Sequence, residues 1–194
     1  MPEAHEHMEH AEHAAHSNKG IALLIAVLAL FLSFSETLGK SAQTEAVDAN
    51  VKSSDSWAFF QAKDIRKTTL LTAANQTMLL AAGLTDPAAK SAIEKQVEIW
   101  RKTAARYQSD PKTGVGREQL ARRARAEEAS RDLAMARYHH YELASAAFQI
   151  GIVLASAAVI TEMIALAWLS GVLGLAGLGV LALGLFAPHA THLI

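Results

Sequence analysis

Hydrophobic positions are concentrated in three uncharged runs, and a long polar segment separates the first run from the other two. No Asp, Glu, Lys or Arg occurs in residues 20–34, 143–161 or 163–187. An apolar run of about twenty residues matches the roughly 30 Å hydrocarbon core of a bilayer. We therefore predict three transmembrane helices at residues 20–38, 142–169 and 171–187. Ser170–Gly171 would form the turn between the last two, and Pro188 would end the third.

The central segment, residues 41–141, is predicted to be helical almost throughout. It is rich in helix formers, and strong turn signals occur only in "GLTDPAAK" and "SDPKTGVG". In the first, Gly83 closes a helix, Asp86 caps the next and Pro87 occupies its first turn. These two breaks predict three soluble helices, at residues 41–82, 87–108 and 117–141.

The middle helix has the clearest periodicity. Its inward positions step by 4, 3, 4 and 3, as in the seam of a coiled coil: Ile93, Val97, Trp100, Ala104 and Tyr107. The predicted fold class is thus an all-α membrane protein, with a helical, coiled-coil-like stalk between the first and second of three transmembrane helices. Residues 1–19 form a His/Glu-rich tail, and residues 188–194 a short C-terminal tail. Many inward positions are alanine and bury little area, so we expect oligomerisation to stabilise the stalk.

Composition and charge add an orientation. Hydrophobic residues make up 51% of the 194, and the absence of cysteine excludes disulfides and thiol catalysis. Of the 18 Lys and Arg residues, all but Lys19 lie between Lys40 and Arg137. Positive residues remain on the cytoplasmic side, which predicts a cytoplasmic stalk and C-terminus and an external N-terminus.

A resemblance is carried by the motif "WAFFQAKDIRKTTL" at residues 57–70. Together with the Glu/His-rich N-terminus, the early membrane span and the C-terminal pair of spans, it resembles a family of bacterial membrane proteins known only as a domain of unknown function. The resemblance covers most of the chain. It implies a bacterial inner-membrane protein and no particular activity.

The same motif holds the densest polar and aromatic cluster. We identify it as a candidate interaction surface for a protein partner, a lipid head group or a neighbouring subunit. The alternative is that Trp57 and Phe60 pack against Trp100 and Tyr107 of the middle helix, as aromatic residues at helical spacing usually do. The candidate surface consists of Trp57, Phe60, Gln61, Lys63 and Lys67.

Glu162 is the most conspicuous single residue, since the predicted spans place it inside the membrane. An ionisable group there costs about 2.5–3.5 kcal/mol and suggests a functional site. Thr161 is its nearest polar neighbour, and Glu36 of the first span lies too far away in depth to touch it. Symmetry copies of Glu162 around an oligomer axis would form a ring suited to a cation pathway. The alternative is a neutral acid bonded to a carbonyl, or a carboxylate within reach of the outer head groups.

The tail is a weak candidate metal site for zinc, nickel or copper. Its histidines recur mostly every three residues, a spacing that drifts around a helix and collects no single ligand face. The alternative is a solvated segment whose charge changes near pH 6.5. The histidines are His5, His7, His10, His13 and His16.

The leading functional hypothesis is a non-enzymatic structural or interaction module in the membrane, forming a homo-oligomer and using no cofactor. Its partners would be the lipid bilayer, further copies of itself and an unidentified protein, but no nucleic acid. The basic residues at 121–137 are interrupted by acidic ones, which favours intrahelical ion pairs instead. Two alternatives remain: an ion channel or transport accessory with Glu162 on its axis, and a metal or pH sensor that uses the tail.

Overall fold

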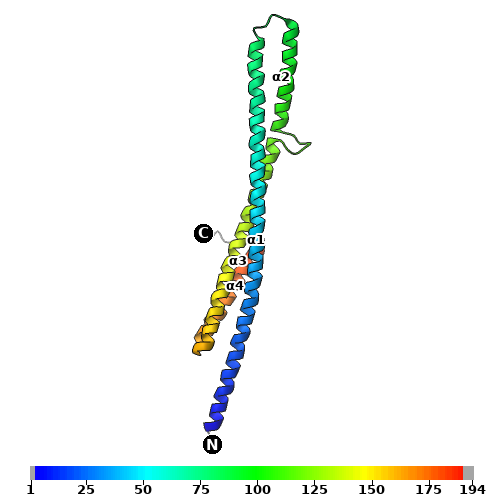
Figure 1. The fold of residues 1–194 in the computed structure, drawn as a ribbon. Helices are drawn as coiled ribbons and strands as arrows, with labels where there is room; N and C mark the ends of the chain where they lie inside the picture. Colours follow the sequence, from blue (N-terminus) through cyan, green and yellow to red (C-terminus); the bar gives the residue numbers. More distant parts are fainter. Residues whose placement is uncertain (1–2, 190–194) are drawn as a thin grey trace. The chain divides into compact units, whose positions relative to one another are not determined.

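The computed structural model describes the backbone of residues 3–189 and the side chains of residues 19–189. This part of the chain is all-helical and contains four helices (Figure 1). They are α1 (Glu3–Ala81), α2 (Pro87–Gln108), α3 (Arg117–Thr161) and α4 (Ile164–Phe186). Three of them, α1, α3 and α4, are long and apolar enough to cross a membrane.

The chain divides into two compact units. Unit 1 takes the chain up to Ala46 and again from Asp132, and unit 2 is Val47–Arg131. Helices α1 and α3 each contribute to both units, whereas α2 belongs to unit 2 and α4 to unit 1.

The breaks around α2 confirm the turn signals in the sequence. Asp86 accepts a hydrogen bond from the Ala88 amide at 2.9 Å and so caps α2, whose first residue is Pro87. The loop before α3 requires glycine at position 116, because a Cβ atom there would lie 2.5 Å from the Asp110 amide nitrogen and 2.8 Å from the Ser109 Cα. The observed bounds of α2 and the start of α3 are those predicted.

Helix α1 has no interruption at residues 38–41, so the first span and the first central helix are continuous, without a hinge at Gly39. One predicted boundary is wrong. The turn predicted at Ser170–Gly171 lies instead at Glu162–Met163, and both Ser170 and Gly171 are inside α4. Glu162 makes this short turn possible by adopting a positive φ of 58°, a conformation uncommon outside glycine.

Unit 1 packs α1, α3 and α4 around an apolar core. Phe148 of α3 is fully buried and stacks on Phe31 of α1, with ring centroids 6.0 Å apart. Leu28 and Tyr141 belong to the same buried cluster. Helix α4 faces this core with mostly small residues, which allow the backbones to approach closely; the buried positions are Ser170, Gly174, Gly177, Leu181 and Gly184.

Unit 2 is a helical hairpin in which α2, and then the start of α3, run antiparallel to α1 (Figure 1). The seam predicted for α2 faces inward, since Val97 and Ala104 are buried and Ile93, Trp100 and Tyr107 are half-buried. At each point along α1 in unit 2, only one other helix, either α2 or α3, packs against it (Figure 1). The core of unit 2 is therefore thin.

Candidate functional site

Three residues of the predicted interaction surface, Phe60, Lys63 and Lys67, lie where the end of α2 and the start of α3 meet α1. With the residues around them they form what we call the junction cluster: Phe60, Lys63, Asp64, Lys67, Tyr107, Gln108 and Arg117. Each cationic side chain in it has a partner on another helix of unit 2, so the cluster joins all three helices.

Gln108 is the centre of this cluster. Its Oε1 accepts hydrogen bonds from Lys67 Nζ at 2.8 Å and from Arg117 Nη1 at 2.9 Å, and its Nε2 donates to Glu118 at 3.1 Å. The amide thus holds one cation from α1 and one from α3 at the last residue of α2. Removing it would leave two cations facing each other without an acceptor between them.

Arg117 lies between an acid and an aromatic ring. Its guanidinium carbon is 4.6 Å from the centroid of Phe60, and its Nε is 3.1 Å from Asp64 Oδ1. That nitrogen is buried and lacks hydrogen-bond geometry to any partner, so the contact with Asp64 is an ion pair only. Lys63 makes a second cation–π contact, 4.8 Å from the Tyr107 centroid.

Trp57 has other partners than Trp100 or Tyr107. Its indole Nε1 donates to Glu128 of α3 at 2.8 Å, and its ring meets Phe60 edge-on at 5.4 Å. Gln61 is exposed. Of the five predicted surface residues, Trp57, Phe60, Lys63 and Lys67 make contacts within the chain, so in this structure they serve internal packing.

The surface that has no partner in unit 2 is on the opposite side of α1. We call it the outer face of α1: Ala58, Ala62, Ile65, Thr69, Thr72, Gln76 and Leu79. All seven residues are exposed. A groove of about 500 Å³ lies along it, lined by Ile65, Thr69, Thr72 and Gln76 together with their neighbours Asp64, Thr68 and Ala73. No prediction from the sequence covered this face, although its spacing is visible there.

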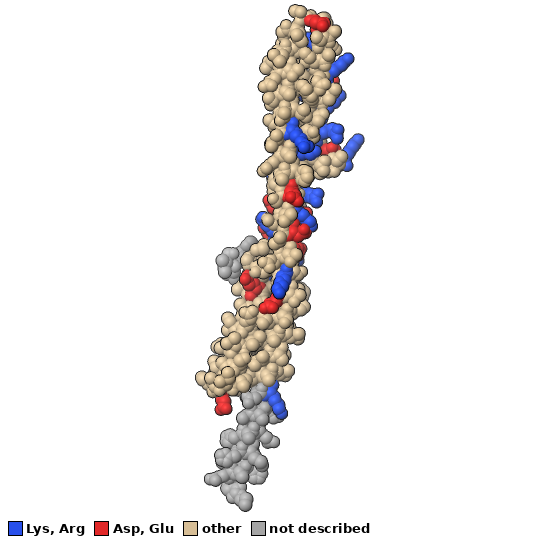
Figure 2. Space-filling view, viewed as in Figure 1, with Lys and Arg blue, Asp and Glu red and all other residues tan. Residues whose placement is uncertain are grey.

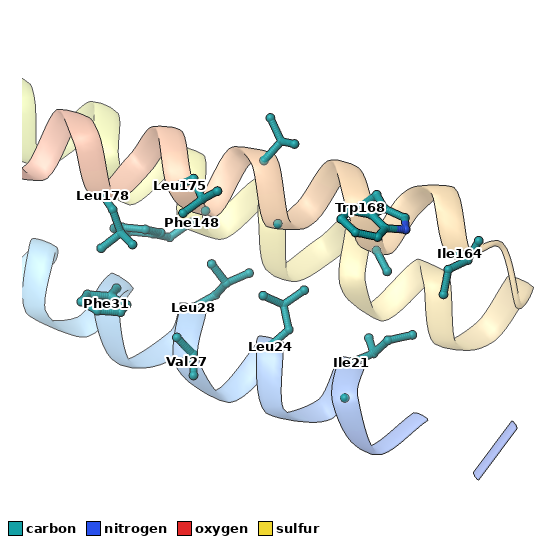
Figure 3. A pocket seen from close by; sticks show the side chains of 15 residues that line it. Ile21, Leu24, Val27, Leu28, Phe31, Phe148, Ile164, Trp168, Leu175 and Leu178 are labelled. Atoms are coloured by element: carbon teal, nitrogen blue, oxygen red, sulfur yellow. The ribbon is translucent and has the colours of Figure 1, made fainter. Parts of the chain in front are cut away.

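A second groove lies in unit 1 between α1 and α4, with Phe148 of α3 at its base (Figure 3). Its volume is about 650 Å³ and its lining is almost entirely apolar, including Leu24, Leu28, Trp168 and Leu175. The glycines of α4 form part of its wall. Within a membrane such a groove would be filled by lipid chains or by another apolar helix.

The polar residues predicted in the membrane are not brought together. Glu162 is exposed in the turn between α3 and α4, which corrects its placement inside a span. The Thr161 hydroxyl donates to the Ala157 carbonyl at 2.8 Å, a bond within its own helix. Glu36 accepts from Gln149 at 3.5 Å, and Gln149 precedes Thr161 by twelve residues, or about 18 Å along α3.

The histidines proposed as metal ligands, from His5 to His16, lie outside the residues whose side chains the structure describes. Among residues 19–189, no group of three His, Asp or Glu side chains is arranged to hold a metal ion.

Comparison with known proteins gives one family match. A model of a domain of unknown function, DUF4337, matches residues 17–187. The chain belongs to this family. The match covers α1 from residue 17 and all of α2, α3 and α4. It therefore includes all of unit 2 and most of unit 1. No curated protein and no solved structure matches the chain.

Proposed function

We propose that this DUF4337 protein is an integral membrane protein that works as a non-enzymatic, homo-oligomeric interaction module. Unit 1 anchors it in a bacterial inner membrane, and unit 2 supplies the surface through which copies associate. The central segment and the C-terminus are cytoplasmic, and the N-terminus is external. Protein partners other than itself would dock on the same unit, and nucleic acid is not among them.

The observation that carries the proposal is the imbalance between buried and exposed apolar residues in unit 2. Within Val47–Arg131, all of which is described, Val97 and Leu120 are the only buried side chains larger than alanine or serine. Over the same range, four large side chains of α1 are exposed by 62–76%: Phe59, Ile65, Leu79 and Leu80. Large apolar side chains that stay exposed on a helix with so thin a core are available to a partner protein.

The anchoring role is supported by the composition of α1, α3 and α4, each long and apolar enough to span a membrane. Close contacts at glycine also suit a membrane bundle, where packing replaces the hydrophobic effect as the force between helices. The orientation is supported by the positions of Lys and Arg, and the bacterial assignment by the resemblance of the Trp57–Lys63 motif.

The geometry gives less support to the two alternative functions, a cation pathway and a metal or pH sensor. A cation pathway lined by Glu162 needs that carboxylate within a span, whereas it lies in the exposed turn that joins α3 and α4. Sensing of metal or pH by the tail depends on histidines outside the described side chains.

Co-expression of two copies of the full chain, one carrying a C-terminal affinity tag and the other a C-terminal epitope tag, tests the proposal. Membranes are solubilised in a mild detergent and the affinity-tagged copy is captured. The epitope-tagged copy should be retained after co-expression and absent when separately expressed membranes are mixed after solubilisation. If co-expressed copies are recovered no better than mixed ones, homo-oligomerisation is refuted.

A further inference from the structure

The outer face of α1 has the spacing of a coiled-coil seam. Its seven residues step by 4, 3, 4, 3, 4 and 3 from Ala58 to Leu79, the alternation that keeps a row of side chains facing one partner helix. In heptad terms, Ala58, Ile65, Thr72 and Leu79 are d positions. Ala62, Thr69 and Gln76 are a positions.

The opposite face of α1 has the same spacing and is already occupied. Ser56, Phe60, Lys63, Lys67, Leu70 and Ala74 step by 4, 3, 4, 3 and 4, and each is buried or half-buried. Phe60, Lys63 and Lys67 are the residues that contact Arg117, Tyr107 and Gln108 of α2 and α3. Helix α1 therefore has two seams on roughly opposite sides, one filled within the chain and one open.

The open seam is unusually free of charge. Residues 68–85 contain no Asp, Glu, Lys or Arg, and this end of α1 shows a continuous uncharged surface beside the basic side chains of α2 (Figure 2). The groove of about 500 Å³ coincides with the middle of the seam. A neutral seam attracts neither a basic nor an acidic partner in particular, and nothing in it repels a copy of itself.

We infer that the outer face of α1 pairs with the same face of a second copy of the chain, the two α1 helices lying parallel and in register. This inference rests on the proposed function, because two copies anchored in one membrane with the same topology present α1 in the same direction. Parallel pairing places identical residues opposite each other: Ile65 on Ile65, Thr72 on Thr72 and Leu79 on Leu79.

Two details of the seam favour this partner. Gln76 would lie opposite Gln76 of the other copy. A primary amide both donates and accepts hydrogen bonds, so the two side chains can bond to each other. A polar residue at an a position also fixes the register of the pair. The flanking positions bring no like charges together, since Arg66 would face Gln61 of the other copy, and Asn75 would face Leu80. The exposed Phe59 and Leu80 would cover the edges of the seam.

Because the chain has no cysteine, single substitutions test the pairing in the full-length protein in lipid bilayers. Ile65→Cys and Thr72→Cys place thiols at d positions, within disulfide distance of their copies in a parallel pair. Ile99→Cys is the matched control, since Ile99 is exposed on α2, away from the seam. Under mild oxidation we expect covalent dimer from Ile65→Cys and Thr72→Cys at least tenfold faster than from Ile99→Cys. Equal rates at all three positions would indicate random collision and overturn the inference.

A second variant separates this inference from the proposed function. Ile65→Glu places like charges face to face in the seam and should reduce the recovery of one tagged copy with the other at least tenfold, whereas Ile99→Glu should leave it unchanged. Both sites are exposed, so the helical circular dichroism of each variant should equal that of wild type. If copies still associate in Ile65→Glu at the wild-type level, the interface is elsewhere: this inference fails and the proposed function stands. If wild-type copies do not associate at all, both fail.

Discussion

Gly177 of α4 tests the packing of unit 1, because the structure leaves no room for a side chain there. A Cβ atom at position 177 would lie 2.8 Å from Cε1 of Phe148 and 3.1 Å from Cδ1 and Cζ. That ring is fully buried and stacked on Phe31, so it cannot rotate away without disturbing the core. Gly177→Ala should therefore destabilise the bundle.

Gly179, two residues further along α4, supplies the control. A Cβ atom there has nothing within 4 Å. Both substitutions gain the helix propensity of alanine, about 1 kcal/mol in water. Only Gly177→Ala incurs the cost of overpacking, about 1–3 kcal/mol. The free energies of unfolding of the two variants should differ by this cost.

Thermal unfolding in detergent, followed by tryptophan fluorescence, measures the difference. For a chain of this size, 2 kcal/mol corresponds to about 4–8 °C in Tm. We expect Gly177→Ala to melt below Gly179→Ala by that margin, and the further substitution Phe148→Leu to recover part of it, as expected for residues in contact. Equal melting temperatures for the two alanine variants would refute the close approach of α4 to Phe148.

Three further predictions concern unit 2. Asp86→Ala removes the cap of α2 and should lower stability by about 1 kcal/mol, whereas Asp86→Ser should retain most of it; chemical denaturation compares them, and equal losses would contradict the capping role. Trp57→Phe removes the N–H that donates to Glu128 and should cost about 1 kcal/mol in the same assay, with no loss expected from Ile99→Leu at an exposed position of α2. The hydrogen bond from Thr113 holds the pKa of Asp110 below its ordinary value. A group whose pKa is lowered in the folded state contributes stability above its unfolded pKa, and that stability is lost as pH falls through the folded pKa. The protection of the amides in loop 109–116, measured relative to their intrinsic exchange rates, should therefore decrease below about pH 4. Asp110→Asn should abolish that dependence, and an unchanged pH profile in this variant would contradict the assignment.

The sequence predicted the parts of the fold that local signals determine. Asp86 with Pro87 and the glycines before Arg117 set the ends of α2 and the start of α3, and both positions are confirmed. The turn at Glu162–Met163 was missed because neither residue is a turn former, and a left-handed conformation such as that of Glu162 is uncommon outside glycine. The glycine at position 171 suggested a turn, but the glycines of α4 serve helix contact instead.

The candidate site was predicted only in part, for a related reason. The cluster around Trp57 was recognised from its residue types, yet its partners, Glu128 and Arg117, lie more than 50 residues away and no local pattern connects them. The outer face was overlooked because α1 has apolar residues on both sides, so no single amphipathic direction stands out. It became visible only when the contacts of α2 and α3 identified which seam was already filled.

Association of copies of this chain in the membrane can be measured by native mass spectrometry of the full-length protein released from lipid nanodiscs. One chain has a mass of 20.8 kDa. We expect a dominant species at twice that mass or a higher multiple, which Ile65→Glu converts to single chains and Ile99→Glu leaves intact. A wild-type protein released as single chains at every protein-to-nanodisc ratio would contradict this association.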